Sequence, residues 1–120
     1  MMLSKFYKVN NVSYRDTGWC VSLELMAEHS LYKGHFPGHP IVPGVCIMQI
    51  IKECTADILG KELQYDYISS CKFLSAINPV LNSCLELTLR TKELENGNIQ
   101  LYAEGEYEGT GFVKLKATLF

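Results

Sequence analysis

One histidine, His35, lies in a stiff segment that leads into the start of a predicted helix. Glycine and proline residues surround it, so the imidazole would be held in place before a substrate arrives. The first N–H groups of a helix have no partner inside the helix, and they favour negative charge. Gly44, at the helix start, is expected to let a ligand approach the backbone closely. A histidine beside such a terminus is suited to act as a general base next to an oxyanion hole.

The segment 34–45 reads Gly-His-Phe-Pro-Gly-His-Pro-Ile-Val-Pro-Gly-Val. It resembles the signature of the β-hydroxyacyl-acyl-carrier-protein dehydratases, the hot-dog enzymes of fatty-acid synthesis. Their loop reads Gly-His-Phe-Pro-Gly-x-Pro-x-x-Pro-Gly-Val, and every fixed position is met here. Two later segments, Lys72-Phe73 and Asn78-Pro79-Val80, resemble the part of the family that follows its helix. The resemblance therefore covers most of the chain, and it is weakest in the first 25 residues.

The resemblance implies a dehydration of 3-hydroxyacyl thioesters to trans-2-enoyl thioesters. His35 would remove the α-proton, and the N–H of Gly44 or Val45 would stabilise the thioester oxygen. Phe36 would belong to the substrate-binding part of the loop. The substrate would arrive on the phosphopantetheine of an acyl carrier protein or of coenzyme A, with no other cofactor. The family also implies a dimer with its helices side by side and each active site at the interface.

The chain departs from the family at the second catalytic position. Fourteen positions after His35, where the family has a helix carboxylate from the partner subunit, this chain has Gln49. An amide can hydrogen-bond the departing hydroxyl but cannot give it a proton, and losing a general acid typically costs about 10²–10⁴ in rate. Either His35 performs both proton transfers in a syn elimination, or Glu53, one helical turn (~5.4 Å) further on, replaces the missing acid. Against the second route, Glu53 is expected to share a solvated helix face with Gln49, Lys52 and Asp57.

Three functions from different classes remain open at this point. The first is the dehydratase, a lyase. The second is a non-catalytic or half-active subunit, or an acyl-binding partner of another hot-dog protein, which Gln49 would explain. The third is a hot-dog acyl thioesterase, which the His-Phe-Pro-Gly loop disfavours. The partner is accordingly a second copy of this chain in a homodimer, another hot-dog chain in a heterodimer, or a higher oligomer.

The periodicity of the sequence predicts one helix. Ile47, Ile50, Ile51, Cys54 and Ile58 form one apolar stripe at helical spacing between about Val45 and Leu59. Pro43 is suited to a position just before or at the first turn, and Gly60 is suited to the C-terminal cap.

Alternation and turn residues predict strands in the rest of the chain. The predicted strands span residues 5–14, 19–26, 65–77, 84–94, 99–107 and 112–120. Asn96-Gly97 suits a type I′ hairpin turn. Because one helix must cover one face of a large sheet, and because of the resemblance, we expect an α+β hot-dog fold. It would comprise one long helix wrapped by an antiparallel sheet of about five to six strands, in a single domain spanning residues 1–120.

The composition limits the kinds of partner. The chain has 120 residues, a net charge of -2 and no Lys/Arg cluster, which argues against nucleic acid and anionic membranes as partners. No signal-like start is present and the apolar run 41–51 is short and broken, so a cytoplasmic protein is expected. An acidic carrier protein would need a basic rim, for which Lys33, His39, Lys72 and Arg90 are candidates.

The cysteines and histidines do not predict a metal site. Five cysteines, an odd number without a Cys-x-x-Cys motif, argue against a disulfide framework and a thiolate zinc site. Cys46 lies near the helix start, where a thiol pKa can fall, but ordinary packing is the favoured interpretation. No metal is expected at His29, His35 and His39, because no carboxylate or cysteine has ligand spacing with them.

Overall fold

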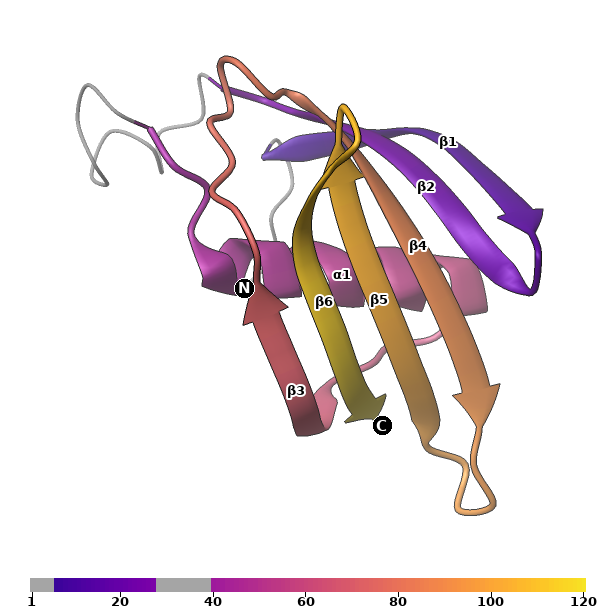
Figure 1. Ribbon diagram of the computed structural model, residues 1–120. Coiled ribbons are helices and arrows are strands. Elements are labelled where there is room, and N and C mark those ends of the chain that lie inside the picture. The colour runs from indigo at the N-terminus through magenta and orange to yellow at the C-terminus, as the bar shows by residue number, and fades with distance from the viewer. Residues whose placement is uncertain (1–5, 28–39) are drawn as a thin grey trace.

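The computed structural model describes residues 6–27 and 40–120. The elements are β1 (Tyr7–Arg15), β2 (Gly18–Leu25), α1 (Gly44–Leu59), β3 (Tyr65–Phe73), β4 (Cys84–Glu93), β5 (Ile99–Tyr107) and β6 (Thr110–Leu119). The strands form one antiparallel sheet in the order β1-β2-β4-β5-β6-β3. Figure 1 shows this sheet curving around α1. The predicted hot-dog architecture, with one long helix and an antiparallel sheet, is confirmed.

Helix α1 begins and ends where its backbone chemistry favours. Pro43 is the N-cap, and its carbonyl oxygen accepts hydrogen bonds from the N–H groups of Cys46 and Ile47 at 2.9 and 3.2 Å. At the other end, Gly60 adopts the left-handed conformation with φ of 69° and donates its N–H to Ala56, as predicted for a glycine cap. No helix within the described parts of the chain is long and apolar enough to cross a membrane.

The core lies between α1 and the concave face of the sheet. The buried helix residues are Cys46, Ile47, Ile50, Ile51, Cys54 and Thr55. Facing them are the inward rows of the central strands, among them Val21, Leu23, Leu85, Leu87, Leu89, Leu101, Leu115 and Leu119. The inward residues of the strands, which repeat every two positions, and the apolar stripe of the helix, which repeats about every 3.6, thus pack together in one core. Tyr65 links β3 to α1 by a hydrogen bond, in which its hydroxyl donates to the Met48 carbonyl at 2.7 Å.

Two hairpin turns have positive φ at both central residues, the pattern of a type I′ turn. Between β1 and β2 these residues are Asp16 (52°) and Thr17 (66°). Between β5 and β6 they are Glu108 (49°) and Gly109 (80°).

The predicted type I′ turn at Asn96-Gly97 is wrong, because only Gly97 has a positive φ there. Instead, the Leu94 N–H bonds to the Asn98 carbonyl and the Gly97 N–H bonds to the Leu94 carbonyl. This is a three-residue loop that places glycine alone in the left-handed region. The Asn96 side chain accepts the Asn98 N–H at 3.0 Å, which stabilises the longer loop.

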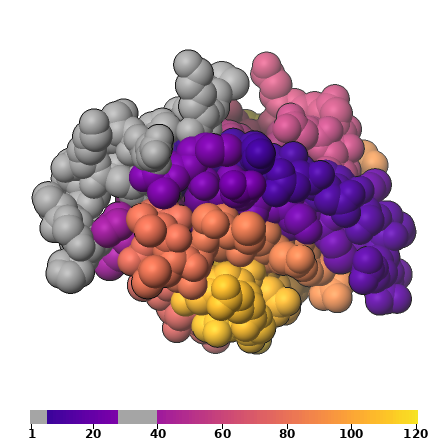
Figure 2. Space-filling model, turned by 90° about the horizontal axis from the view of Figure 1, so that it is seen from above, coloured from indigo at the N-terminus to yellow at the C-terminus, as the bar shows by residue number. Residues whose placement is uncertain are grey.

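Strand β3 is shorter than predicted, and the residues after it help to build the site. Its pairing with β6 ends at Phe73 opposite Val113, so the extension to Ile77 is wrong. The chain turns instead towards the start of α1, where the Ile77 carbonyl accepts the Val42 N–H at 3.0 Å. Further on it runs along the end of β2, and Figure 2 shows this orange segment against the purple strand.

Candidate active site at the start of the helix

The N-terminus of α1 can interact favourably with a negatively charged group. The first N–H groups that bond within the helix belong to Cys46 and Ile47, so those of Gly44 and Val45 precede the helical hydrogen-bond pattern. The N-cap residue Pro43 provides no side-chain hydrogen bond to this end, and no acidic residue lies in the first turn. The helix dipole there is therefore not compensated by an acidic side chain of the first turn. This arrangement is suited to stabilise an oxygen atom that gains negative charge.

An aromatic ring from β3 lies against Gly44, on the side where another residue would carry its Cβ atom. A Cβ atom at this position would lie 2.8 Å from Cζ of Phe73. The Phe73 ring occupies that side of Gly44, and the close approach of a ligand to the Gly44 backbone stays a prediction. The glycine permits the close approach of β3 to the helix start. Phe73 is itself half exposed, so its ring forms part of the surface beside the open N–H groups.

An apolar hollow of about 350 Å³ adjoins the helix start. Its lining includes Ile41, Val42, Gly44, Ile47, Phe73, Leu74 and Ile77. These residues come from the segment before α1, from α1 itself and from the end of β3, which the Val42–Ile77 hydrogen bond holds together. An apolar hollow beside a helix N-terminus is suited to an acyl chain that ends in a polarised carbonyl.

Burial raises the pKa of the Cys46 thiol, although the residue lies in the first turn of α1. Its side chain is 2% exposed and packs in the core. Packing, the favoured interpretation from sequence, is confirmed.

A polar network lies on the same helix, one turn after Val45. The Gln49 amide nitrogen Nε2 donates to Glu53 Oε2 at 2.8 Å. The Tyr7 hydroxyl, from the first residue of β1, donates to Glu53 Oε1 at 2.9 Å. Burial, the nearby Cys54 and the hydrogen bond to Glu53 all raise the pKa of Tyr7, so this phenol stays a donor. The carboxylate is thus held from the sheet and from its own helix at once.

The structure brings Gln49 and Glu53 together, as their spacing of four predicts. They are half-buried, whereas Asp57 is exposed and Lys52 bonds to Gln64 at 3.0 Å. The expected solvated face therefore applies to Asp57 but not to the Gln49–Glu53 pair. Sequence reasoning missed Tyr7, because nothing in the spacing of residues 7 and 53 signals that they meet.

Part of the expected site falls outside residues 6–27 and 40–120. These residues are His35 and Phe36, together with His29, Lys33 and His39. Within the described ranges, no group of three or more histidine, cysteine, aspartate or glutamate side chains is arranged to hold a metal ion.

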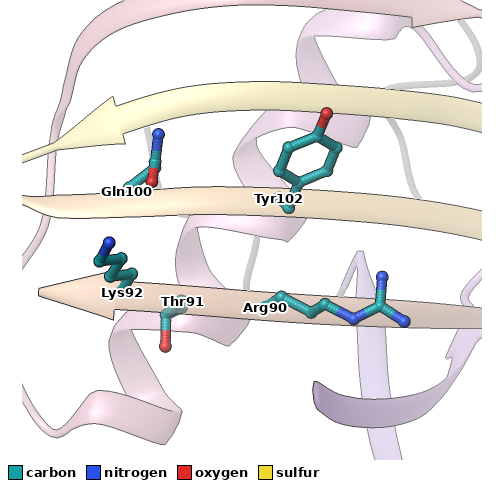
Figure 3. Close-up of a pocket in the computed structure, with 5 residues that line it drawn as sticks. All are labelled: Arg90, Thr91, Lys92, Gln100 and Tyr102. Atoms are coloured by element: carbon teal, nitrogen blue, oxygen red, sulfur yellow. The ribbon is translucent and has the colours of Figure 1, made fainter. Parts of the chain in front are cut away.

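The two described candidates for a basic rim lie on the outer face of the sheet. Arg90 pairs with Tyr102 across β4 and β5, and Lys72 pairs with Lys114 across β3 and β6. Arg90 and Tyr102 line a hollow of about 250 Å³ on this face, and Figure 3 shows their side chains on neighbouring strands. The Lys116 ammonium lies 5.6 Å from the centre of the Tyr102 ring. This surface is separated by the sheet from the apolar hollow at the helix start.

Comparison with known proteins shows the family of this chain. The family model of the ApeI dehydratase matches residues 11–109. The chain belongs to the ApeI-like dehydratase family. It is 36% identical over 66 residues to the 3-hydroxyacyl-[acyl-carrier-protein] dehydratase FabZ of Ligilactobacillus salivarius, covering 49% of this chain and 47% of that protein. It is 30% identical over 96 residues to FabZ of Myxococcus xanthus, covering 66% and 63%. The matches thus span less than two thirds of these relatives.

Solved structures show the same fold at low sequence identity. The dehydratase heterocomplex ApeI:P from Xenorhabdus doucetiae superposes with a TM-score of 0.77 at 18% identity, covering 93% of this chain and 96% of that chain. A hypothetical thioesterase with coenzyme A from Streptococcus pneumoniae superposes with a TM-score of 0.63 at 12% identity, covering 99% and 89%. These similarities establish the hot-dog fold of this chain.

Proposed function

We propose that this chain dehydrates 3-hydroxyacyl thioesters, carried on an acyl carrier protein or coenzyme A, to trans-2-enoyl thioesters. The observation that carries the proposal is the open N-terminus of α1 beside an apolar hollow, in a chain of the ApeI-like dehydratase family. The thioester carbonyl would accept from the N–H of Gly44 or Val45. The acyl chain would occupy the hollow beside Phe73.

In the proposed reaction, the base His35 takes the α-proton. The electron pair of that C–H bond becomes the double bond between C2 and C3, and the C3–O bond breaks. The departing hydroxyl takes up one proton and leaves as water. In a syn elimination the same imidazole returns the proton, so no second acid is required. The Gln49 amide would hydrogen-bond the departing oxygen without giving it a proton.

We further propose that two hot-dog chains complete the site. Val45, Gln49 and Glu53 follow one another at intervals of four along one face of α1. Val45 is 64% exposed although it is apolar and lies beside the open N–H groups. A partner helix lying along this face would cover Val45 and would bring its own loop towards Gln49.

The decisive assay follows the ultraviolet absorbance of the enoyl thioester formed by the purified chain. His35→Ala should abolish turnover. Gln49→Glu should raise the rate if the absence of an acid limits it, by up to about 10²-fold. Glu53→Gln should lower the rate if Glu53 acts in the site. A homogeneous, folded wild-type protein with no turnover on either carrier would contradict the proposal.

Gln49 favours a second candidate, a subunit that works with another hot-dog chain. The amide stands at the position of the family's carboxylate, so a partner could supply the acid while this chain supplies His35. The structural neighbour ApeI:P is described as a dehydratase heterocomplex. Co-purification of a second hot-dog chain, with turnover only in the mixture, would favour this candidate over the homodimer.

A thioesterase is the third candidate, and the same samples test it. Release of free thiol from the acyl thioester, without enoyl product, would identify hydrolysis. One structural neighbour is described as a hypothetical thioesterase with coenzyme A, but at 12% identity it supports the fold alone.

A further inference from the structure

We propose that Tyr7 is a positioning residue for Gln49: through the Glu53 carboxylate, it fixes which edge of the Gln49 amide faces the substrate. The inference rests on the proposed function for the role of Gln49 and adds the residues that orient it. The anchoring group comes from β1, which supplies the Tyr7 hydroxyl.

The orientation follows from the hydrogen bonds to Glu53. An ionised carboxylate has only acceptors, so each neighbour must present a donor to it. Tyr7 does so with its hydroxyl at 2.9 Å, and Gln49 does so with Nε2 at 2.8 Å. The amide nitrogen of Gln49 is therefore turned towards Glu53, and its carbonyl oxygen is turned to the opposite side of the planar group. Glu53 thus decides between two amide orientations that have nearly the same shape.

Tyr7 gives this pair an anchor outside the helix. Gln49 and Glu53 alone are a pair of long side chains four positions apart, and such a pair interacts only weakly on an isolated helix. Tyr7 belongs to β1, where it pairs with Leu25, and the adjacent Phe6 carbonyl accepts the Met26 N–H at 2.8 Å. The phenol is thereby fixed to the sheet, 46 positions away from Glu53 in the sequence. This second hydrogen bond, from another element, restricts the rotamer of Glu53 and through it the rotamer of Gln49.

The kinetic test is a double-mutant cycle with a matched control. Tyr7→Phe removes only the hydroxyl and should lower kcat roughly tenfold, with little change in KM. In a Gln49→Ala background, the same change should alter kcat by less than about twofold, because the residue being positioned is gone. Tyr65→Phe is the control, since it removes a hydroxyl bonded to the same helix at Met48 but is not part of the network. Additive losses in the cycle would contradict the proposal.

A spectroscopic test decides the orientation without any turnover. The chain has three glutamines, so selective ¹⁵N-glutamine labelling gives three side-chain amide pairs, and the pair missing in Gln49→Ala identifies residue 49. Tyr7→Phe and Glu53→Gln should shift the Gln49 amide signals, and Tyr65→Phe should leave them in place. An unchanged Gln49 signal in folded Tyr7→Phe and Glu53→Gln proteins would overturn the proposal.

The two tests separate this inference from the proposed function. If the wild type has no dehydratase activity but its Gln49 signal depends on Tyr7, the reaction is wrong and the positioning stands. If activity depends on Gln49 while Tyr7→Phe changes neither kcat nor the amide signal, the reaction stands and the positioning is wrong.

Discussion

At the start of α1, the missing side chain of Gly44 decides how closely β3 approaches the helix. A Cβ atom added at Gly44 would lie only 2.8 Å from Cζ of the Phe73 ring. We predict that Gly44→Ala lowers the free energy of unfolding by about 1–2 kcal/mol, because the ring or the helix start must move. Chemical denaturation measures this change.

The Phe73→Ala background provides the control for Gly44→Ala. With the ring removed, the alanine has room, and its higher helix propensity should make the change neutral or stabilising. An equal loss in both backgrounds would show that the contact with Phe73 is not the cause.

The buried Cys54 predicts a difference in thiol reactivity and a dependence on pH. Burial is the main reason that its pKa rises to about 12 from an ordinary value of 9.0. At pH 8 we expect an aromatic disulfide reagent to modify exposed Cys84 within minutes and Cys54 only on unfolding, as peptide mass spectrometry can show. The folded state prefers the neutral thiol, so this contribution to stability is present below pH 9 and is lost as pH rises towards 12. Fast labelling of Cys54 in the folded protein would contradict the prediction.

At the scale of the elements, the β1–β2 hairpin contains a residue with an unfavourable backbone conformation. Thr17 has a φ of 66° although it is β-branched. Because glycine adopts this region without a steric penalty, Thr17→Gly should stabilise the protein by about 1 kcal/mol. The same exchange at Thr118, within β6, should destabilise it by a similar amount. A lower melting temperature for Thr17→Gly would contradict this explanation of the turn.

At the scale of the whole molecule, the proposed pairing of two chains predicts the effect of a charge on α1. Val45→Arg would place a charge on the face that the partner covers, and the dissociation constant of the dimer should rise at least about tenfold. Val80→Arg is the matched control, because Val80 is 63% exposed but lies in the segment after β3. Sedimentation velocity over a range of concentrations measures both. Equal dissociation constants for the two variants and the wild type would show that α1 is not at the interface.

The sequence by itself determined the elements and the helix start. The stripe from Ile47 to Cys54 placed α1, Gly60 ended it, and alternation placed the strands, because these signals depend on residues close together in the chain. The loop motif also identified the dehydratase family that the family model confirms. Two predictions were wrong. Asn96-Gly97 formed a longer loop than a two-residue turn. Strand β3 ended at Phe73, because its pairing with β6 stops there and the chain turns towards the start of α1.

Only the tertiary structure decided which distant residues meet. Phe73 covers Gly44, and Tyr7 holds Glu53, although no periodicity relates these positions. The strand order places β1 and β3 at opposite edges of one sheet curved around α1, so residues from both ends of the sheet reach the same helix. Such contacts depend on packing across the whole sheet, and a pattern that repeats every two or 3.6 residues carries no information about them.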